Sequence, residues 1–322
     1  MRAVEVKKRM NDCGRMKTPF LFAVDFDMKE GIFIENPLHQ TEVLFRTPTA
    51  KVSQQSKLLS TFIDLSAQPI TLSEYKDRFD IIMQGLMRGD SYLTNLTVRT
   101  PVQTNLSLEE IFLLSNSPYG LYIPGKFVCF SPERFIRIAN DTISTNPMKG
   151  TISAEVSNAK CVILGDPKET AEHNTIVDLM RNDIGMVAED VQVERFRYID
   201  RIKTHNGDIL QVSSEITGRL PKDNLSHLGD IVFRMLPAGS VSGAPKQSTV
   251  NLIHKAEPEA RGYYTGVFGY FDGSELDTAV LIRFIVQDEN KLFFHSGGGI
   301  TINSDHKIEY DEVLKKIYLP II

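Results

Sequence analysis

Two pairs of glutamates lie at the start of two segments with helical periodicity. Glu169 and Glu172 are three residues apart, as are Glu309 and Glu312, and this spacing places both members of a pair on one helix face. If the two faces point at one another, their carboxylates require a cation, and oxygen ligands without Cys or His favour Mg²⁺ over zinc. The alternative is that each pair is a solvated cluster favoured by the helix dipole.

A lysine occupies a cramped place in the sequence STNPMKGT, residues 144–151. Pro147 and Gly150 flank Lys149, which is compatible with an ordinary solvated loop cation. The same surroundings would also hold an amine still for nucleophilic attack, because burial or nearby positive charge can free a lysine amine of its proton. The local sequence leaves both interpretations open.

Three further charged residues stand where a partner is needed. Lys316 follows Glu312 by four residues, so it forms either a weak salt bridge or a cation that awaits a substrate carboxylate beside the metal. Arg283 is the one charge in the apolar run AVLIRFIV, and it requires an anionic partner, either a structural acid or a carboxylate ligand. Glu133 in SPERF lies between strand-like runs, where an unpaired carboxylate is costly.

Two glycine-rich stretches are candidates for anion binding. The sequence HSGGGIT, residues 295–301, allows backbone N–H groups to approach an anion, although a tight β-turn is the simpler explanation. The sequence GSVSGAPKQS lacks the spacing of a nucleotide phosphate loop, because two residues separate Gly243 from Lys246. We therefore expect a rigid turn before a helix at that place.

The elements that position these residues follow from the hydrophobic pattern. Helices are predicted at residues 71–90, 165–188, 226–237, 248–260 and 308–318. Strands are predicted at residues 20–27, 31–36, 42–47, 91–102, 126–140, 142–153, 263–273, 276–290 and 291–303. Because strands come in consecutive runs instead of alternating with helices, the pattern indicates an α+β fold with antiparallel sheets.

Composition narrows the class of protein. The chain has 322 residues, of which 42% are apolar and 24% are charged, as in soluble globular proteins. Its net charge of −5, without a basic block, argues against nucleic-acid binding. The widely spaced Cys13, Cys129 and Cys161 support neither a disulfide framework nor a zinc site. The absence of a signal-like or membrane-spanning apolar run leads us to expect a cytoplasmic protein.

Eight motifs, in order, closely resemble those of the chorismate-utilising enzymes, a family that includes anthranilate, aminodeoxychorismate, isochorismate and salicylate synthases. They are SPERF, PMKGT, AEHNTIVDLMRNDIG, GSVSGAPK, GYYTGVFGYF, LIRF, SGGGI and EYDEVLKK. The resemblance implies two antiparallel β-sheets packed as a sandwich with flanking helices, and an active site in the cleft between them. It also implies a single catalytic domain over residues 1–322.

Within that domain, the resemblance implies N-terminal strands over residues 1–70 and a catalytic core over residues 75–322. The N-terminal part is shorter than in relatives that carry a tryptophan-binding sheet, which makes regulation by tryptophan doubtful. Gln211 occupies a position where many relatives have a histidine. Any role of that histidine therefore does not transfer to this chain.

The resemblance also implies roles for the acids and their neighbours. Glu172 and Glu312 would coordinate Mg²⁺, with Glu169 and Glu309 in support, and the metal would hold the ring carboxylate of chorismate. The enolpyruvyl carboxylate would be bound by Arg283 and Tyr264. The rest of the substrate cradle would be formed by Lys316, the amides of Gly298 and Gly299, Thr151 and Ser240.

Lys149 distinguishes members of this family. Anthranilate synthases resemble this stretch but carry alanine at the position of Lys149, whereas aminodeoxychorismate synthases carry a lysine that attacks the chorismate ring at C2. Ammonia then adds at C4 as the lysine leaves. Glu133 matches the glutamate that acts as general acid and base in the latter enzymes. The resemblance therefore implies an aminodeoxychorismate synthase component I, which serves p-aminobenzoate and folate synthesis.

No part of the chain resembles a glutamine amidotransferase, so ammonia is expected from a separate glutamine amidotransferase subunit. Two alternatives remain. One is an anthranilate or isochorismate synthase, of which Lys149 disfavours the anthranilate synthase. The other is an inactive relative that only binds its amidotransferase partner, against which stands the joint presence of Lys149, Arg283, Lys316 and the four acids.

Overall fold

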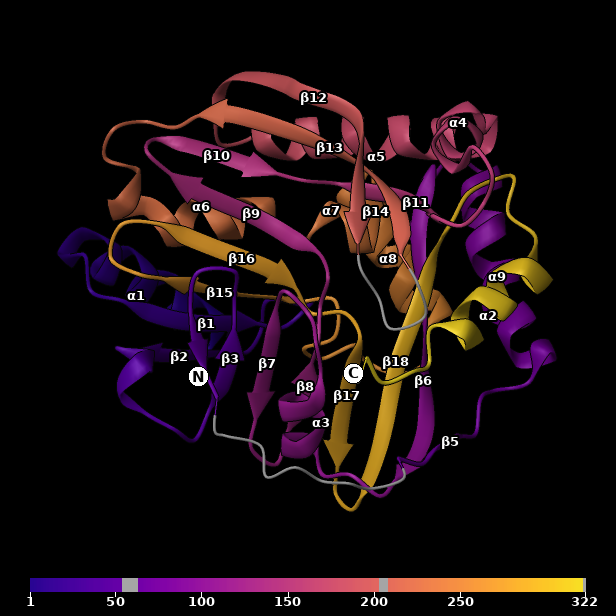
Figure 1. Cartoon of the computed structure of the whole chain (residues 1–322), viewed down its shortest axis with the longest axis horizontal. Coiled ribbons are helices and arrows are strands. Elements are labelled where there is room, and N and C mark those ends of the chain that lie inside the picture. Colours follow the sequence, from indigo (N-terminus) through magenta and orange to yellow (C-terminus); the bar gives the residue numbers. More distant parts are fainter. Residues whose placement is uncertain (54–62, 203–207, 321–322) are drawn as a thin grey trace.

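Two antiparallel β-sheets form the centre of the molecule (Figure 1). The computed structural model of the chain describes residues 1–53, 63–202 and 208–320. Within them each sheet has nine strands, and one hydrophobic cluster draws Leu21 and Phe268 from the first sheet and Leu121 and Phe284 from the second. The sheets therefore pack face to face, and the predicted α+β sandwich is confirmed.

The two sheets differ in strand order. The first runs β11, β13, β10, β9, β16, β15, β1 and β2, with β12 beside β13, and the second runs β14, β6, β18, β17, β8, β7, β3 and β4, with β5 beside β6. The first comprises β1 (Phe20–Val24), β2 (Gly31–Glu35), β9 (Arg134–Ala139), β10 (Thr142–Thr145), β11 (Met148–Ser153), β12 (Glu189–Ile202), β13 (Ile209–Arg219), β15 (Val267–Phe271) and β16 (Leu276–Val280). The second comprises β3 (Leu44–Arg46), β4 (Lys51–Val52), β5 (Leu65–Ala67), β6 (Leu93–Thr104), β7 (Gly120–Ile123), β8 (Phe127–Cys129), β14 (Gly243–Ala244), β17 (Phe284–Asp288) and β18 (Lys291–Ile300).

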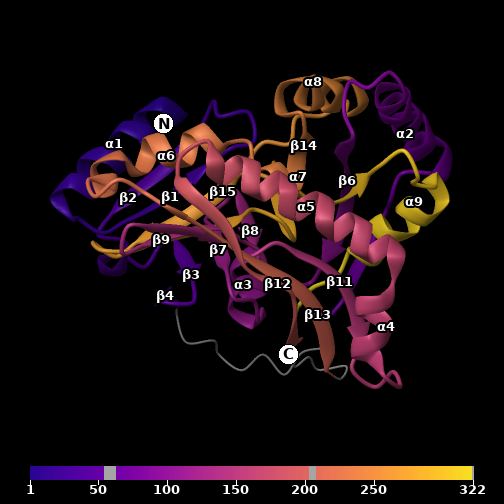
Figure 2. The same cartoon turned by 90° about the horizontal axis from the view of Figure 1, so that it is seen from above.

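Helices cover the outer faces of the two sheets (Figure 2). They are α1 (Ala3–Met16), α2 (Leu72–Met87), α3 (Leu108–Leu114), α4 (Ala159–Gly165), α5 (Pro167–Gly185), α6 (Leu228–Met235), α7 (Gly239–Ser242), α8 (Lys246–Ala256) and α9 (His306–Lys315), with short 3-10 turns at Pro37–His39 and Asn224–His227. Helices α1, α5 and α6 lie over the first sheet, and α2, α3, α8 and α9 lie over the second. Each of the five predicted helices is present, as α2, α5, α6, α8 and α9.

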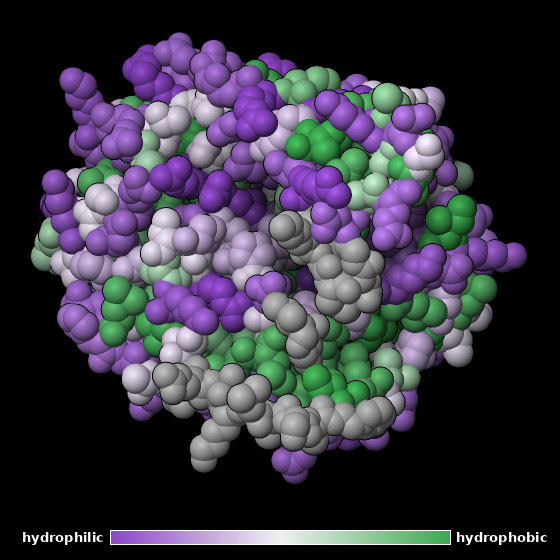
Figure 3. Space-filling model, in the orientation of Figure 1, coloured by the Kyte–Doolittle hydropathy of each residue, from purple (hydrophilic) through white to green (hydrophobic). Residues whose placement is uncertain are grey.

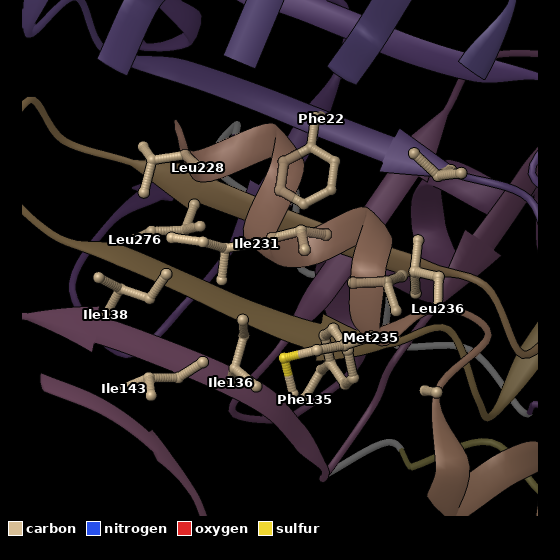
Figure 4. Packing of buried hydrophobic residues seen from close by; sticks show 14 of the residues in the cluster. Phe22, Phe135, Ile136, Ile138, Ile143, Leu228, Ile231, Met235, Leu236 and Leu276 are labelled. Atoms are coloured by element: carbon tan, nitrogen blue, oxygen red, sulfur yellow. The ribbon is translucent and has the colours of Figure 1, made fainter. Parts of the chain in front are cut away.

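Helix α6 shows how the apolar pattern fixes this packing (Figure 4). Leu228, Ile231 and Met235 recur at helical spacing and are buried against the first sheet, where Ile136 of β9 and Leu276 of β16 meet them. Apolar residues spaced by three or four along the helix thus pack against residues that point to the same face of the sheet.

The start of α5 is set by local sequence. Asp166 is the N-cap residue, and its carboxylate accepts the backbone N–H of Glu169 at 3.0 Å, while Pro167 occupies the first turn. Such a cap satisfies a backbone donor that the helix itself cannot pair. The cap fixes the first turn of α5, which contains Glu169, and Glu172 follows in the next turn.

The predicted single strand over residues 276–290 is wrong. The run instead divides into β16 of the first sheet and β17 of the second, with Arg283 just before β17 at a φ of 53°. The predicted strand over residues 126–140 divides in the same way into β8 and β9, with Glu133 at the end of the break. The run AVLIRFIV is apolar except for Arg283, so periodicity does not reveal the first change of sheet. In the other run, Ser131, Pro132 and Glu133 interrupt the apolar pattern where the chain passes from β8 to β9.

Residues 1–70 contain a helix as well as strands. Helix α1, for which no helix was predicted, buries Val6, Met10 and Cys13 and exposes charged residues on its other face. The strands that follow belong to both sheets, with β1 and β2 in the first and β3, β4 and β5 in the second. Residues 54–62 of this predicted region lie outside the described residues. None of the described helices combines the length and apolar composition that a membrane crossing requires.

Candidate active site

A cleft of about 1730 Å³ opens between the two sheets in the described part of the chain. Its walls come from β11, β18, the first turns of α5, the end of α9, the short helix α7 and the two crossings between the sheets. In the view of Figure 3, hydrophilic side chains border a hollow near the centre of the molecule. All the predicted site residues line the cleft except Glu169 and Glu309.

Glu133 and Arg283 stand at the two crossings, which hydrogen bonds hold together. The backbone N–H of Phe130 donates to Arg283 O at 3.0 Å, and the N–H of Val280 donates to Glu133 O at 3.3 Å. The left-handed conformation of Arg283 costs a non-glycine residue energy. This conformation breaks the apolar strand and lets Arg283 line the cleft.

The guanidinium of Arg283 retains an unused donor. Its Nε is buried and has no hydrogen-bond partner among the described residues, and its guanidinium carbon lies 5.4 Å from the centre of the Tyr318 ring. Tyr264 forms a buried part of the same wall, with its ring 4.9 Å from that of His295. A carboxylate ligand in the cleft would satisfy the free donor of Arg283.

The two acidic pairs approach the cleft from α5 and α9, and each has a lysine as its counterion. Lys149 Nζ lies 2.8 Å from Glu172 Oε2, and Lys316 Nζ lies 2.6 Å from Glu312 Oε1. Lys316 also donates to Gly297 O at 2.7 Å. The i,i+4 salt bridge expected for Lys316 is therefore present, and it places the ammonium at the wall of the cleft.

Burial and charge act in opposite directions on these lysines. Burial lowers the pKa of Lys149, but Glu172 above all, together with Glu312 and Glu169, raises it, and the net effect is a raised pKa. For Lys316 burial prevails over Glu312, so its pKa is lowered. Lys149 is thus held as an ammonium while Glu172 is its partner.

Glu133 has the properties of a proton donor. Burial of its carboxyl raises its pKa, although a hydrogen bond from the Ser240 hydroxyl and the charges of Arg283 and Lys149 partly offset this rise. Ser240 belongs to α7, whose first residue Gly239 donates its N–H to Asp183 Oδ2 at 3.3 Å. A raised pKa keeps the protonated carboxyl populated at higher pH, as a general acid requires.

The donor set suits a hard divalent cation. Among the described residues, no group of three His, Cys, Asp or Glu side chains lies at metal-binding spacing. The pairs nevertheless share one electrostatic environment, because Glu172, Glu312 and Glu169 all act on Lys149. One oxygen of Glu169 is buried without a hydrogen-bond partner among the described residues. Carboxylate oxygens now paired with lysines could accept Mg²⁺, which prefers such ligands.

Two polar contacts near the site were not predicted. Lys246 Nζ lies 3.0 Å from the buried Asp183 Oδ1 and donates to Met235 O, which explains why this lysine serves no phosphate loop. His173 is fully buried next to Glu172, with its Nε2 2.7 Å from Ser214 Oγ. An acid within the apolar stripe of α5 is the sequence signal that could have indicated Asp183.

The remaining predicted residues lie on opposite walls. Thr151 of β11 pairs with Gln211 of β13, and both line the cleft. Gly298 and Gly299 lie on β18 in register with Leu96 and Asn95 of β6, so they form part of a strand and the simpler interpretation as a tight turn is wrong. Without side chains, this strand leaves space beside the carboxylates of α9.

Known proteins are similar to this chain in both sequence and fold. A family model described as chorismate binding enzyme matches residues 34–321. An uncharacterized PabA-like protein of Haemophilus influenzae is 48% identical over 98% of this chain and 96% of its own length. Aminodeoxychorismate synthase component 1 of Salmonella typhimurium is 32% identical over 77% of this chain, which spans 57% of that relative.

Solved structures add to these matches. Anthranilate synthase component I from Streptococcus pneumoniae has a TM-score of 0.66 and is 28% identical over 80% of this chain and 59% of its own. The menaquinone-specific isochorismate synthase of Escherichia coli has a TM-score of 0.74 over 98% of this chain and 80% of its own. At 14% identity, the second of these similarities shows the fold alone.

Proposed function

Because the chain belongs to the chorismate binding enzyme family, we propose that it converts chorismate and ammonia to 4-amino-4-deoxychorismate, as component I of an aminodeoxychorismate synthase. The observation that carries the proposal is the position of Lys149. Its amine lines the cleft 2.8 Å from Glu172 Oε2, on the same cleft as Glu133 and Arg283. An amine at this place can act as the nucleophile that the reaction requires.

In the first half of the proposed reaction, the neutral amine of Lys149, whose ammonium proton has been released to solvent, forms a bond to ring C2 while the C4–O bond breaks. Glu133 gives its proton to the departing hydroxyl, which leaves as water. In the second half, ammonia bonds to C4 as the bond between C2 and Lys149 breaks. The proton released by the incoming nitrogen returns to the Glu133 carboxylate, so both residues regain their starting forms.

Charged groups would hold the substrate with ring C2 next to Lys149 and the C4 hydroxyl next to Glu133. The unpaired Nε of Arg283 would bind the enolpyruvyl carboxylate beside Tyr264. Lys316 and the backbone of Gly298 and Gly299 would contact the substrate from the opposite wall. Arginine suits the first role because its planar guanidinium can bind a carboxylate through two parallel hydrogen bonds.

Mg²⁺ is the proposed cofactor. Glu172 and Glu312, with Glu169 and Glu309 in support, would hold the ion, which would supply positive charge for the ring carboxylate. With Glu172 engaged in this way, Lys149 would lose the charge that raises its pKa most, while burial, which lowers that pKa, would remain. The acids would thus control both substrate orientation and the protonation state of the nucleophile.

Ammonia would come from a separate glutamine amidotransferase subunit. The Salmonella typhimurium relative is itself a component 1, which is the ground for expecting a second component here. Among the 322 residues no segment was recognised as an amidotransferase. The proposed partner would release ammonia for the second half of the reaction.

Product identification tests this proposal. The purified chain is incubated with chorismate, Mg²⁺ and excess ammonium, and the products are separated by chromatography and identified by mass. We expect 4-amino-4-deoxychorismate. Anthranilate would instead assign the activity of the Streptococcus pneumoniae enzyme, and isochorismate that of the Escherichia coli enzyme. Unchanged chorismate would contradict every catalytic assignment and favour an inactive partner-binding relative.

Gly298→Ala, with Gly297→Ala as its matched control, tests the substrate wall. A Cβ on Gly298 lies 3.5 Å from Glu309 Oε2 and 3.8 Å from Lys316 Nζ, so alanine fits the fold but occupies space in front of the charges. We expect KM for chorismate to rise by about 10-fold or more with an unchanged unfolding temperature. A Cβ on Gly297 meets Leu96 O at 2.6 Å, so that variant should lose about 1–3 kcal/mol of stability. Unchanged KM in Gly298→Ala would remove this wall from the substrate site.

A further inference from the structure

We propose that Arg134 is a positioning residue that joins the segment carrying Glu133 to the segment carrying Lys149, an inference that rests on the proposed function. These two residues lie on different elements, since Glu133 precedes β9 and Lys149 lies in β11. Strand β11 pairs with β13 and makes no ladder with β9. Their relative position is set by the ladder that runs through β10 and β13 and by side-chain contacts that cross it.

Arg134 supplies such a contact through four donor bonds. Its Nη1 donates to Asn146 Oδ1 at 3.0 Å. Its Nε donates to Tyr119 Oη at 2.9 Å and to Asp277 Oδ1 at 3.0 Å, and its Nη2 donates to Asp277 Oδ2 at 3.3 Å. The planar guanidinium thus binds Asp277 and Tyr119, here called the anchor, on one side and Asn146 on the other.

The anchor is rigid because it is buried. Asp277 of β16 and Tyr119 are each only 3% exposed, and Tyr119 Oη also donates to Asp277 Oδ1 at 2.9 Å. All three side chains therefore hold one another in place within the sandwich. An arginine with this anchor has little freedom to follow movements of the loop it grips.

Asn146 lies in the short connection between β10 and β11. It follows the last residue of β10, Thr145, and comes three residues before Lys149. Its Nδ2 also donates to Tyr198 Oη of β12 at 3.5 Å. The link from Arg134 to Asn146 therefore adds a side-chain contact, beside the backbone pairing of β9 with β10, at the connection that leads to the nucleophile.

The consequence for catalysis is geometric. Glu133 must deliver a proton to one ring substituent while Lys149 attacks another ring carbon, so their separation has to match the substrate. A misplacement of about 1 Å can lower a rate by about 100-fold. Loss of the link should therefore lower kcat much more than it changes KM, because Arg283, Lys316 and the acids remain in place.

The test uses Asn146→Leu, which removes the link and leaves the pair of Arg134 and Asp277 intact. We expect kcat to fall by about 10- to 100-fold, with KM for chorismate within about twofold and an unchanged unfolding temperature. Asn146→Asp keeps an oxygen acceptor for Arg134 and should restore most of kcat. Equal activity of Asn146→Leu and the parent would overturn the proposal, as would a failure of Asn146→Asp to exceed Asn146→Leu.

Arg134→Gln and Arg137→Gln provide a matched comparison on the same strand. Arg137 Nη2 also forms a salt bridge, at 2.6 Å to Glu275 Oε2, but it makes no contact with the Asn146 turn that the structure describes. Arg134→Gln should lose kcat as Asn146→Leu does, and the double variant should lose little more, because both changes remove one link. Arg137→Gln should keep kcat. Fully additive losses, or an equal loss in Arg137→Gln, would contradict the proposal.

Amide hydrogen exchange separates this inference from the proposed function. Residues 146–151 should exchange faster in Asn146→Leu than in the parent, whatever the reaction of the enzyme is, while residues 134–139 keep their protection. If the parent leaves chorismate unchanged, the proposed function fails and the exchange result still decides whether Arg134 restrains this turn. Unchanged exchange in residues 146–151 would sink the positioning role even in an active enzyme.

Discussion

Lys149→Ala is expected to abolish formation of 4-amino-4-deoxychorismate, with a loss of kcat of about 1000-fold or more. The reason is that alanine has no nucleophile to attack ring C2 and expel the C4 hydroxyl. The fold should persist because Lys149 is partly exposed at the cleft wall, where its ion pair with Glu172 contributes at most about 1 kcal/mol. Product formation under saturating chorismate, Mg²⁺ and ammonium measures the first effect, and denaturant unfolding measures the second.

Two control variants separate nucleophilicity from charge. Lys149→Arg keeps a cation beside Glu172, but a guanidinium remains protonated and cannot attack, so it should be as inactive as Lys149→Ala. Lys168→Ala removes another cation, 3.8 Å from Glu172 Oε1 and 70% exposed, and should keep activity within a few-fold. Turnover by Lys149→Arg close to that of the parent would refute the covalent role and leave Lys149 only an electrostatic one.

The sequence predicted the helices and the fold class better than the places where the chain passes from one sheet to the other. The long helices were found because their apolar stripes and caps are local signals, as in α2 and α5. The division of residues 276–290 was not found, because a left-handed Arg283 has no signature in an apolar run. That division is what places Arg283 in the cleft, so the feature missed in the fold is also a feature of the site.

The residues of the site were identified individually, but apart from the salt bridge of Lys316 with Glu312 the contacts among them were not. The motifs PMKGT and SPERF indicated Lys149 and Glu133, and the spacing of three residues at two helix starts indicated the acidic pairs. The links that hold them, such as Arg134 to Asn146 and Asp183 to Lys246, join residues at least 12 positions apart. Such pairs depend on sheet topology, which spacing along one sequence does not determine.

Glu133→Gln is expected to lower kcat by about 100- to 10,000-fold, because the amide keeps the shape of the carboxyl but cannot donate its proton to the departing hydroxyl. KM should change little, since Arg283 and Lys316 still bind the substrate. The parent should lose kcat as pH rises through the Glu133 pKa, which burial raises. The residual activity of Glu133→Gln should lack that decline. An unchanged decline in the variant would assign it to another group.

The raised pKa of Glu133 also predicts that Glu133→Gln is more stable than the parent at high pH. A carboxyl whose pKa is higher in the folded than in the unfolded chain contributes stability below the unfolded value, and this contribution is lost as pH rises through the folded value. Glu133→Gln removes the cost of the buried charge, so its free energy of unfolding should exceed that of the parent more at pH 8 than at pH 5.

Ser240→Ala deletes a hydrogen bond that lowers the Glu133 pKa, so it should move the decline in kcat to higher pH. A move to lower pH would show that Ser240 does not stabilise the Glu133 carboxylate, and the assignment of Glu133 as the buried acid of the reaction would lose its physical basis.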